Sequence, residues 1–174
     1  TLLILAVSHP VFDADRHAPL RGPLLIVVDD GWGAARGWQR HLTVMQTLID
    51  RADRTHRPVM LLLTAPPADG GPVRVSSLMP AAQARSVVQA MTPKPWPSDR
   101  AAAIKAVESI NRSETLRIAW VSDGLADDSA HDLARSLQTL GSVDGFADAV
   151  GALPRLLLPP PAVTDAARCS RSPP

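Results

Sequence analysis

The 174-residue sequence lacks several features that would indicate a class of function. It has one cysteine, Cys169, so neither a disulfide framework nor a cysteine zinc site can form within one chain. Its 18 basic and 17 acidic residues leave a net charge of +1, which excludes the strong basic field of a general nucleic-acid binder. The remaining composition, 45% apolar and 20% charged, is that of one ordinary globular domain.

The common catalytic motifs are missing as well. There is no Gly-x-Ser-x-Gly nucleophile elbow, no Gly-x-x-x-x-Gly-Lys phosphate loop and no His-Glu-x-x-His metal motif. Five histidines are scattered over the chain without the spacing of metal ligands: His9, His17, His41, His56 and His131. We therefore expect a protein that is not an enzyme.

No apolar run in the sequence is long enough to cross a membrane, which takes about 20 residues in a helix. The run from Leu2 to Val7 is short, and a polar stretch with Pro10 follows it. By itself this run fits either a short element of the domain or the cut end of a transmembrane helix. At the other end, residues 159–174 are rich in proline and polar residues, which predicts a linker or tail.

Apolar runs and amphipathic segments alternate along the middle of the chain. Continuous apolar runs predict strands buried on both faces, as at the centre of a parallel sheet, over residues 24–28, 59–63 and 116–121. Helical spacing of apolar residues predicts helices over 34–54, 84–91, 99–111 and 129–140. Ser98 is the expected N-cap of the third helix.

Three weaker segments complete the expected sheet. Residues 72–78 open with a proline and predict an antiparallel edge strand, and residues 146–150 and 155–158 predict two more strands. The expected fold class is therefore α/β: a three-layer α/β/α sandwich, Rossmann-like, with a mostly parallel central sheet and one antiparallel edge strand. In such a fold the ligand crevice lies at the carboxyl ends of the central strands.

Acidic residues follow two of the expected central strands. Asp29 and Asp30 close the first strand, and Asp123 follows the strand at 116–121. Carboxylates at adjacent strand ends converge in one crevice, where they suit a hard cation such as Mg²⁺. The alternative is that the acids cap the next helix and form a turn. The residues alone leave both interpretations open.

The order of the elements, the first strand ending in Asp29 and the Ser-Asp-Gly at Asp123 resemble the von Willebrand factor A domain. That family's first motif, Asp-x-Ser-x-Ser, a loop Thr and a later Asp form a metal-ion-dependent adhesion site for Mg²⁺. Here Gly31 and Gly33 stand where the two serines belong, and Ser98 is the one residue that could replace the threonine. The resemblance implies the same fold with a degenerate metal site.

The degenerate site would consist of Asp29, Asp30, Ser98 and Asp123. With two hydroxyl ligands missing we expect no cofactor, and at most weak, millimolar association with Mg²⁺. Asp29 or Asp30 should then accept backbone N–H bonds from the loop at residues 31–35, or cap the helix that follows it.

A second resemblance is to the middle domain of large bacterial inner-membrane proteins of unknown function, whose amino-terminal region is similar to aerotolerance-operon proteins. It rests on the apolar residues 1–7, Asp29-Asp30-Gly31-Trp32, Trp38 and the Pro95-Trp96-Pro97 loop. It implies a membrane-anchored parent with this domain on the periplasmic side. The chain is then divided into a membrane-segment tail and linker (1–21), the von Willebrand factor A-like domain (22–158) and a Pro-rich tail (159–174).

Two tryptophans fall in loops at the predicted crevice. Trp32 and Trp96 either cover each other or contact a protein partner, whereas Trp38 lies on the inward stripe of its helix and is expected in the core. We predict a non-enzymatic protein-interaction module that binds a protein and no nucleic acid. The alternative is a Mg²⁺-dependent binding or hydrolytic site that uses Asp29, Asp30 and Asp123.

Overall fold

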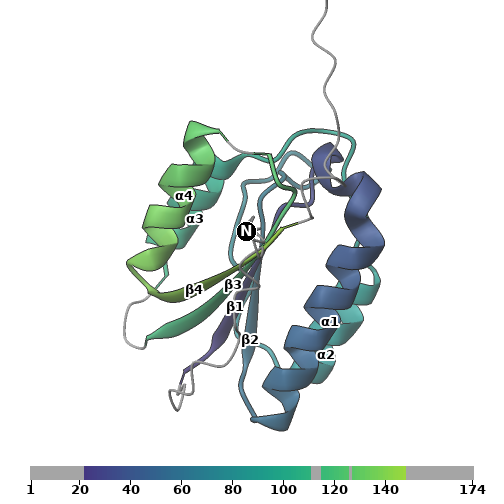
Figure 1. The fold of residues 1–174 in the computed structure, drawn as a ribbon, viewed down its shortest axis with the longest axis vertical. Coiled ribbons are helices and arrows are strands. Elements are labelled where there is room, and N and C mark those ends of the chain that lie inside the picture. Colours follow the sequence, from purple (N-terminus) through teal and green to yellow (C-terminus); the bar gives the residue numbers. More distant parts are fainter. Residues whose placement is uncertain (1–21, 111–114, 126, 148–174) are drawn as a thin grey trace, which may run out of the picture.

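The structure is a computed structural model, which describes residues 22–110, 115–125 and 127–147. The predictions for residues 1–21, for the strand at 155–158 and for the tail at 159–174 lie outside the described residues. Within them the chain forms a sheet with helices on both faces (Figure 1). The predicted α/β/α sandwich is thereby confirmed.

In the described part of the chain, four parallel strands build the central sheet. They are β1 (Leu24–Val28), β2 (Val59–Leu63), β3 (Leu116–Ser122) and β4 (Gly141–Ala147), in the order β2-β1-β3-β4. The three apolar runs are thus the three adjacent strands that the sequence predicts, all in parallel register. The strand expected at 146–150 instead begins at Gly141, three residues after the last helix ends.

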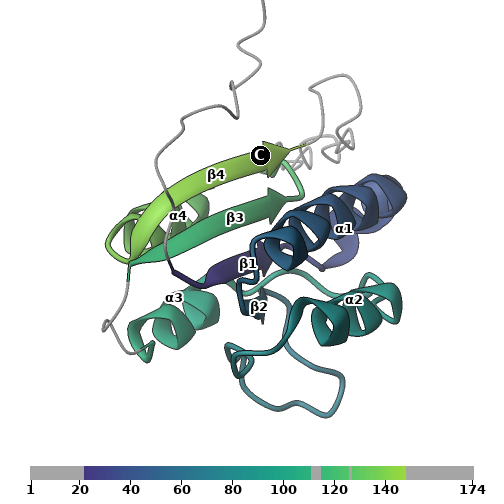
Figure 2. The same ribbon diagram turned by 90° about the horizontal axis from the view of Figure 1, so that it is seen from below.

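The helices cover the sheet in two pairs. They follow a 3₁₀ turn, η1 (Trp32–Gly37), and are α1 (Trp38–Arg54), α2 (Ala81–Gln89), α3 (Arg100–Glu108) and α4 (Asp128–Gln138). Figures 1 and 2 show α1 and α2 on one face and α3 and α4 on the other. Among the described residues, no helix is long and apolar enough to cross a membrane.

Each face of the sheet has its own apolar core. Side chains of β1 point alternately to the two faces, so Ile26 joins the core under α1 and α2 and Leu25 joins the core under α3 and α4. Both are fully buried. Trp38 is 7% exposed, as expected, and its indole N–H donates to the Met91 carbonyl at 3.2 Å, which ties α1 to the end of α2.

The predicted antiparallel strand at 72–78 is reduced to two isolated bridges, which pair Val59 with Met79 and Leu62 with Val75. The direction of pairing is as predicted, but a continuous ladder does not form. Between the bridges the Leu61 N–H donates to the hydroxyl of Ser76 at 2.9 Å, so a side chain replaces a backbone carbonyl as its acceptor.

The predicted N-cap of α3 is wrong by one residue. Asp99 caps the helix, because its carboxylate accepts the Ala102 N–H at 2.8 Å. The hydroxyl of Ser98 is buried and has no hydrogen-bond partner among the described residues. The Asp99 N–H donates to the Thr64 carbonyl at 2.8 Å, which fixes the start of α3 against the end of β2.

Candidate functional site

The carboxyl ends of the three adjacent strands β2, β1 and β3 bring together two acids and a hydroxyl. Asp29 follows β1, Asp123 follows β3 and Thr64 follows β2. Asp29 and Thr64 are fully buried and Asp123 is 5% exposed. The predicted convergence of Asp29 and Asp123 in one crevice is therefore present, and two buried carboxylates must be neutralised there.

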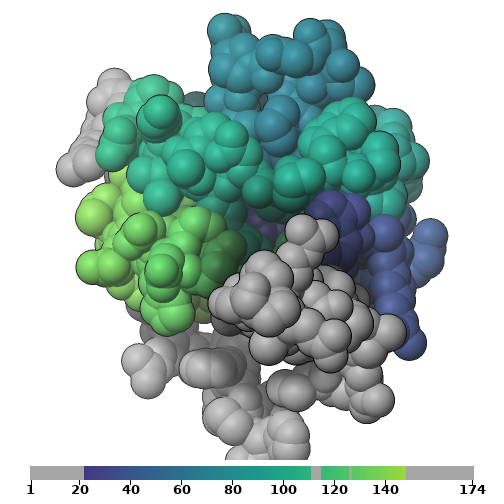
Figure 3. Space-filling model, turned by 90° about the horizontal axis from the view of Figure 1, so that it is seen from above, coloured from purple at the N-terminus to yellow at the C-terminus, as the bar shows by residue number. Residues whose placement is uncertain are grey.

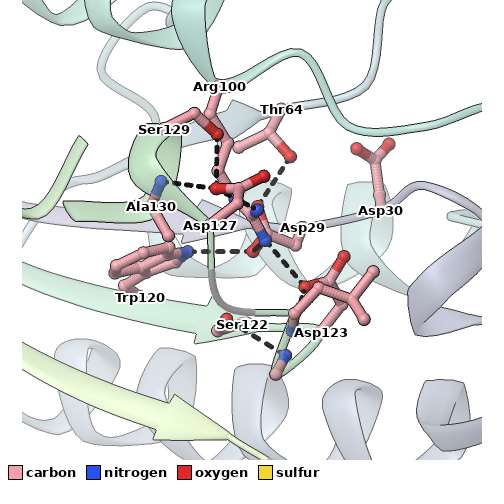
Figure 4. A network of polar contacts seen from close by, with 12 residues as sticks. Asp29, Asp30, Thr64, Arg100, Trp120, Ser122, Asp123, Asp127, Ser129 and Ala130 are labelled. Atoms are coloured by element: carbon pink, nitrogen blue, oxygen red, sulfur yellow. Dashed lines mark hydrogen bonds and ion pairs between the residues drawn. The ribbon is translucent and has the colours of Figure 1, made fainter. Parts of the chain in front are cut away.

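The neutralising cation is the guanidinium of Arg100, the first residue of α3 (Figure 4). Its Nη2 lies 2.9 Å from Asp29 Oδ2 and 2.7 Å from Asp123 Oδ1. Its Nη1 lies 3.3 Å from Asp127 Oδ1, at the start of α4. The Arg100 side chain is 4% exposed, so one buried cation joins the ends of β1 and β3 to both helices of one face.

The remaining contacts of Asp29 are also made by side chains of the crevice (Figure 4). The Thr64 hydroxyl donates to Oδ1 at 2.8 Å, and the indole N–H of Trp120 donates to Oδ2 at 3.3 Å. Asp29 therefore receives hydrogen bonds from β3, from the residue after β2 and from α3. These contacts orient a fully buried carboxylate without help from its own loop.

Asp30 is held separately, on the side of β2. Lys94 Nζ lies 2.6 Å from Asp30 Oδ2 and also donates to the Ala65 carbonyl at 2.8 Å. The Ala65 N–H donates to Asp30 Oδ1 at 2.9 Å. Asp30 is 2% exposed, so this ion pair is largely removed from water.

The expectation that these acids bind the loop at residues 31–35 is wrong. The 3₁₀ turn that begins at Trp32 has no side-chain cap. Asp29 and Asp30 instead accept from groups outside this loop, chiefly the Arg100 and Lys94 cations, together with Thr64, Trp120 and the Ala65 N–H.

Burial and charge act in opposite directions on the groups of this crevice. Burial lowers the pKa of Arg100, but the hydrogen bond to Asp29 and the charges of its acidic neighbours outweigh it, so the pKa is raised. Burial raises the pKa of Asp123, and the charge of Asp29 raises it further, against the opposing effects of the Leu125 N–H and Arg100. Arg100 therefore stays charged, whereas the net effect on Asp123 is a raised pKa.

Asp127 lies at the solvent side of the same cluster. Hydrogen bonds from the Ser129 hydroxyl and the Ala130 N–H lower its pKa, with Arg100 adding to the effect. Its carboxylate is the N-cap of α4. With a side chain 56% exposed, it adds little energy to the ion pair but links the cluster to the surface.

The loop after β1 is packed too tightly for side chains at two positions. A Cβ atom at Gly31 would lie 2.6 Å from the Ser98 nitrogen and 2.9 Å from the Trp96 carbonyl oxygen. A Cβ atom at Gly33 would lie 2.8 Å from Asp123 Oδ2. Neither position can take a serine unless its neighbours move.

The two loop tryptophans lie beside this crevice. Trp32 is 39% exposed, and its backbone N–H donates to the Trp96 carbonyl at 3.0 Å. Trp96 is partly buried and donates its indole N–H to the Pro66 carbonyl at 2.9 Å. Figure 3 looks onto this edge, where the teal stretch that leads to α3 lies between the blue loop after β2 and the purple η1.

Comparison with known proteins gives a fold but no close relative. No protein-family model and no curated protein matches the sequence. The structure of an aerotolerance-related membrane protein from Bacteroides fragilis has a TM-score of 0.51 and 15% identity, over 72% of this chain and 66% of that chain. The SpRpn10 VWA domain has a TM-score of 0.50 and 12% identity, over 75% of this chain and 77% of its own. The fold is that of a von Willebrand factor A domain.

Proximal thread matrix protein 1 from the mussel byssus shares this von Willebrand factor A-like fold, with a TM-score of 0.50 and 12% identity over 72% of this chain. This chain spans only 37% of that protein. A second structure of the mussel protein, with the same TM-score and 13% identity, has zinc in its metal-ion-dependent adhesion motif. At these identities the likeness concerns the fold.

The residues of this von Willebrand factor A-like domain do not fit a divalent cation as they are arranged. A metal between Asp29 and Asp123 would have to share that space with Nη2 of Arg100, which is hydrogen-bonded to both. Two like charges in one buried site repel strongly. Among the described residues, no group of three or more Asp, Glu, His or Cys side chains could hold a metal ion.

Sequence reasoning located the acids but missed both of their cations. Lys94 and Arg100 flank the Pro95-Trp96-Pro97 loop, close to where the resemblance places the loop threonine. The sequence contains a signal for these cations. Buried acids that lack hydroxyl ligands need a counter-charge, and Lys94 and Arg100 are the basic residues on either side of that loop.

Proposed function

We propose that this von Willebrand factor A-like domain is a non-enzymatic protein-interaction module that needs no metal ion. The fold is one commonly used for protein–protein contact. The observation that carries the proposal is the crowded loop after β1, where Gly31 and Gly33 lack hydroxyl groups and leave no room for them. A metal-dependent contact needs those ligands, whereas an apolar contact does not.

The contact surface would be centred on Trp32. It is one of three large apolar side chains described as exposed, and it lies beside the crevice at the carboxyl edge of the sheet. Tryptophan is enriched among residues that dominate binding energies. The Trp96 carbonyl accepts the Trp32 N–H, and the Trp96 indole N–H donates to the Pro66 carbonyl, so the backbone that carries Trp32 is tied to the loop after β2.

The lack of enzymatic activity is part of the same proposal. A general base or nucleophile needs a carboxylate that can reach substrate. Asp29 and Asp30 are at most 2% exposed, and both are ion-paired. Asp123, the third acid of the hydrolytic alternative, is 5% exposed and is also ion-paired, which argues against that alternative.

Photo-crosslinking from position 32 tests the interaction. We replace Trp32 by p-benzoylphenylalanine in the full-length protein in its host cell, and make the same replacement at Leu78 as the control. Leu78 is 55% exposed but lines a cavity beside Pro58, at the amino end of β2. We expect an adduct at position 32 that is unchanged by EDTA. Equal labelling at both positions, or loss of the adduct in EDTA, would contradict the proposal.

We also propose that the domain belongs to a membrane-anchored bacterial protein and lies on the periplasmic side. Support comes from the sequence resemblance described above and from the likeness to the Bacteroides fragilis membrane protein. Alkaline phosphatase and green fluorescent protein fused after residue 160 of the full-length protein report the side. We expect phosphatase activity without fluorescence, and the reverse pattern would place the domain in the cytoplasm.

A further inference from the structure

One positively charged side chain lies where a von Willebrand factor A-like site would hold its ion. Arg100 Nη2 bridges Asp29 and Asp123, the two acids that the strands β1 and β3 contribute to the crevice. The hydroxyl of Thr64 donates to the other oxygen of Asp29, Oδ1. Carboxylate oxygens from two strand ends thus surround one buried cation, and that cation is part of the chain.

The place of Arg100 in its helix does not explain this arrangement. It is the first residue of α3, at the end of a helix dipole that disfavours a positive charge. Burial of its side chain costs further free energy, because the charge leaves water. The compensation comes from the acids, which lie within 2.7 to 3.3 Å of its two terminal nitrogens. The charge of Arg100 is therefore stabilised by the acids of the crevice and not by its place in the helix.

We infer that the guanidinium of Arg100 is a built-in replacement for a divalent cation, so that removing it turns the crevice into a cation-binding site. The guanidinium stays charged at all physiological pH values and is not lost to chelators. It also has no open coordination position that a partner's carboxylate could fill. Without it, the carboxylates of Asp29 and Asp123 remain, and these are oxygen ligands of the type that hard divalent ions prefer.

Thermal unfolding tests the inference on the 174-residue chain. The variants are Arg100→Ala, Arg100→Lys and the control Arg135→Ala, which removes an exposed ion pair with Asp132. Each is measured in EDTA, in millimolar Mn²⁺ and in millimolar guanidinium. We expect the wild type and the control to have the same Tm in all three conditions.

Arg100→Ala should behave differently, because it leaves two buried carboxylates without a counter-ion. In EDTA its Tm should be lower than that of the wild type by about 10 °C. Mn²⁺ or guanidinium should restore about half of this loss, since each binds the folded state alone. Arg100→Lys retains the charge but not the planar guanidinium with its two terminal nitrogens, so its Tm in EDTA should lie between those of the wild type and Arg100→Ala.

Three results would overturn the inference: a wild-type Tm that rises saturably with Mn²⁺, an Arg100→Ala variant that matches Arg135→Ala, or one that responds to neither ion. If Arg100→Ala does not fold in EDTA, the test is whether it refolds when Mn²⁺ is added. The Tm values of the wild type and of Arg100→Lys are then measured against Mn²⁺ concentration, and a saturable rise for the wild type still overturns the inference. The inference rests on the proposed metal-free module, but this assay contains no partner. A failed crosslink at position 32 therefore leaves it standing, and a failed Tm response leaves the contact surface standing.

Discussion

At the scale of single residues, the crevice depends on glycine and arginine together. Gly31 brings the backbone of the loop after β1 against the backbone at Trp96 and Ser98. That close approach places the start of α3, and with it Arg100, above the two central acids. A serine at position 31 would need the space that the Pro-rich loop now fills, and a serine at position 33 would need the space of the Asp123 carboxylate and Leu125. The close packing at Gly31, where a serine ligand would otherwise stand, therefore also positions the Arg100 guanidinium that we infer replaces the metal.

Replacing Gly31 by serine tests this packing. Its Cβ would meet backbone atoms at 2.6 to 3.0 Å, and backbone cannot move as freely as a side-chain tip. We expect a loss of about 1–3 kcal/mol in the free energy of unfolding, measured by urea denaturation. Gly145→Ser is the matched control, because nothing lies within 4 Å of its Cβ position. Equal stability of the two variants, or a gain in stability for Gly31→Ser in Mg²⁺, would contradict the packing argument.

The residues of the site were predictable where they belong to strands. Asp29 and Asp123 end buried apolar runs, so the parallel sheet alone places them together. Arg100 is 71 positions from Asp29, and its role depends on how the loop before α3 crosses the sheet edge. No periodicity encodes that crossing. Long side chains from such loops are therefore the part of the site that sequence patterns predict least.

At the scale of elements, strands made of continuous apolar runs were predicted accurately, and a strand made of mostly polar and small residues was not. β1 and β2 were predicted at their observed bounds because each is a continuous run of buried apolar residues. β4 has the sequence GSVDGFA and is only half-buried along its length, so its amino-terminal part carries no strand signal. Its formation depends on pairing with β3, from Leu116↔Gly141 onward. Tertiary contact, and not local preference, makes it a strand.

Helix starts also depend on contacts that lie outside the helix. α3 begins after Asp99 because the Asp99 backbone is already bound to the Thr64 carbonyl and its side chain is free to cap. Asp127 caps α4 and meets Arg100 of α3 with the same oxygen atom. One acid thus sets the start of α4 and its place beside α3. The sequence predicts a cap near the start of each helix. Whether Ser98 or Asp99 caps α3 depends on the contact of the Asp99 backbone with the Thr64 carbonyl at the sheet edge.

At the scale of the whole molecule, one sheet separates two apolar cores. Ile49 of α1 is fully buried in the core of one face, and Leu137 of α4 is fully buried in the core of the other. Both cores share the strand β1, whose residues alternate between them. The cores should therefore fold as one cooperative unit, although no helix of one pair packs in the core of the other.

Alanine substitutions on the two faces measure this cooperativity. Ile49→Ala and Leu137→Ala should each lower the free energy of unfolding by about 2–5 kcal/mol, because each leaves a cavity in a closely packed core. The two sites lie on opposite faces of the sheet, so their effects should add within about 0.5 kcal/mol. Val87→Ala, at a side chain 38% exposed, is the control and should cost under about 1 kcal/mol. Urea denaturation followed by tryptophan fluorescence and by circular dichroism should give one coincident transition for each single variant. Two separate transitions, with one face retaining its structure after the other has unfolded, would show that the shared sheet does not couple the cores.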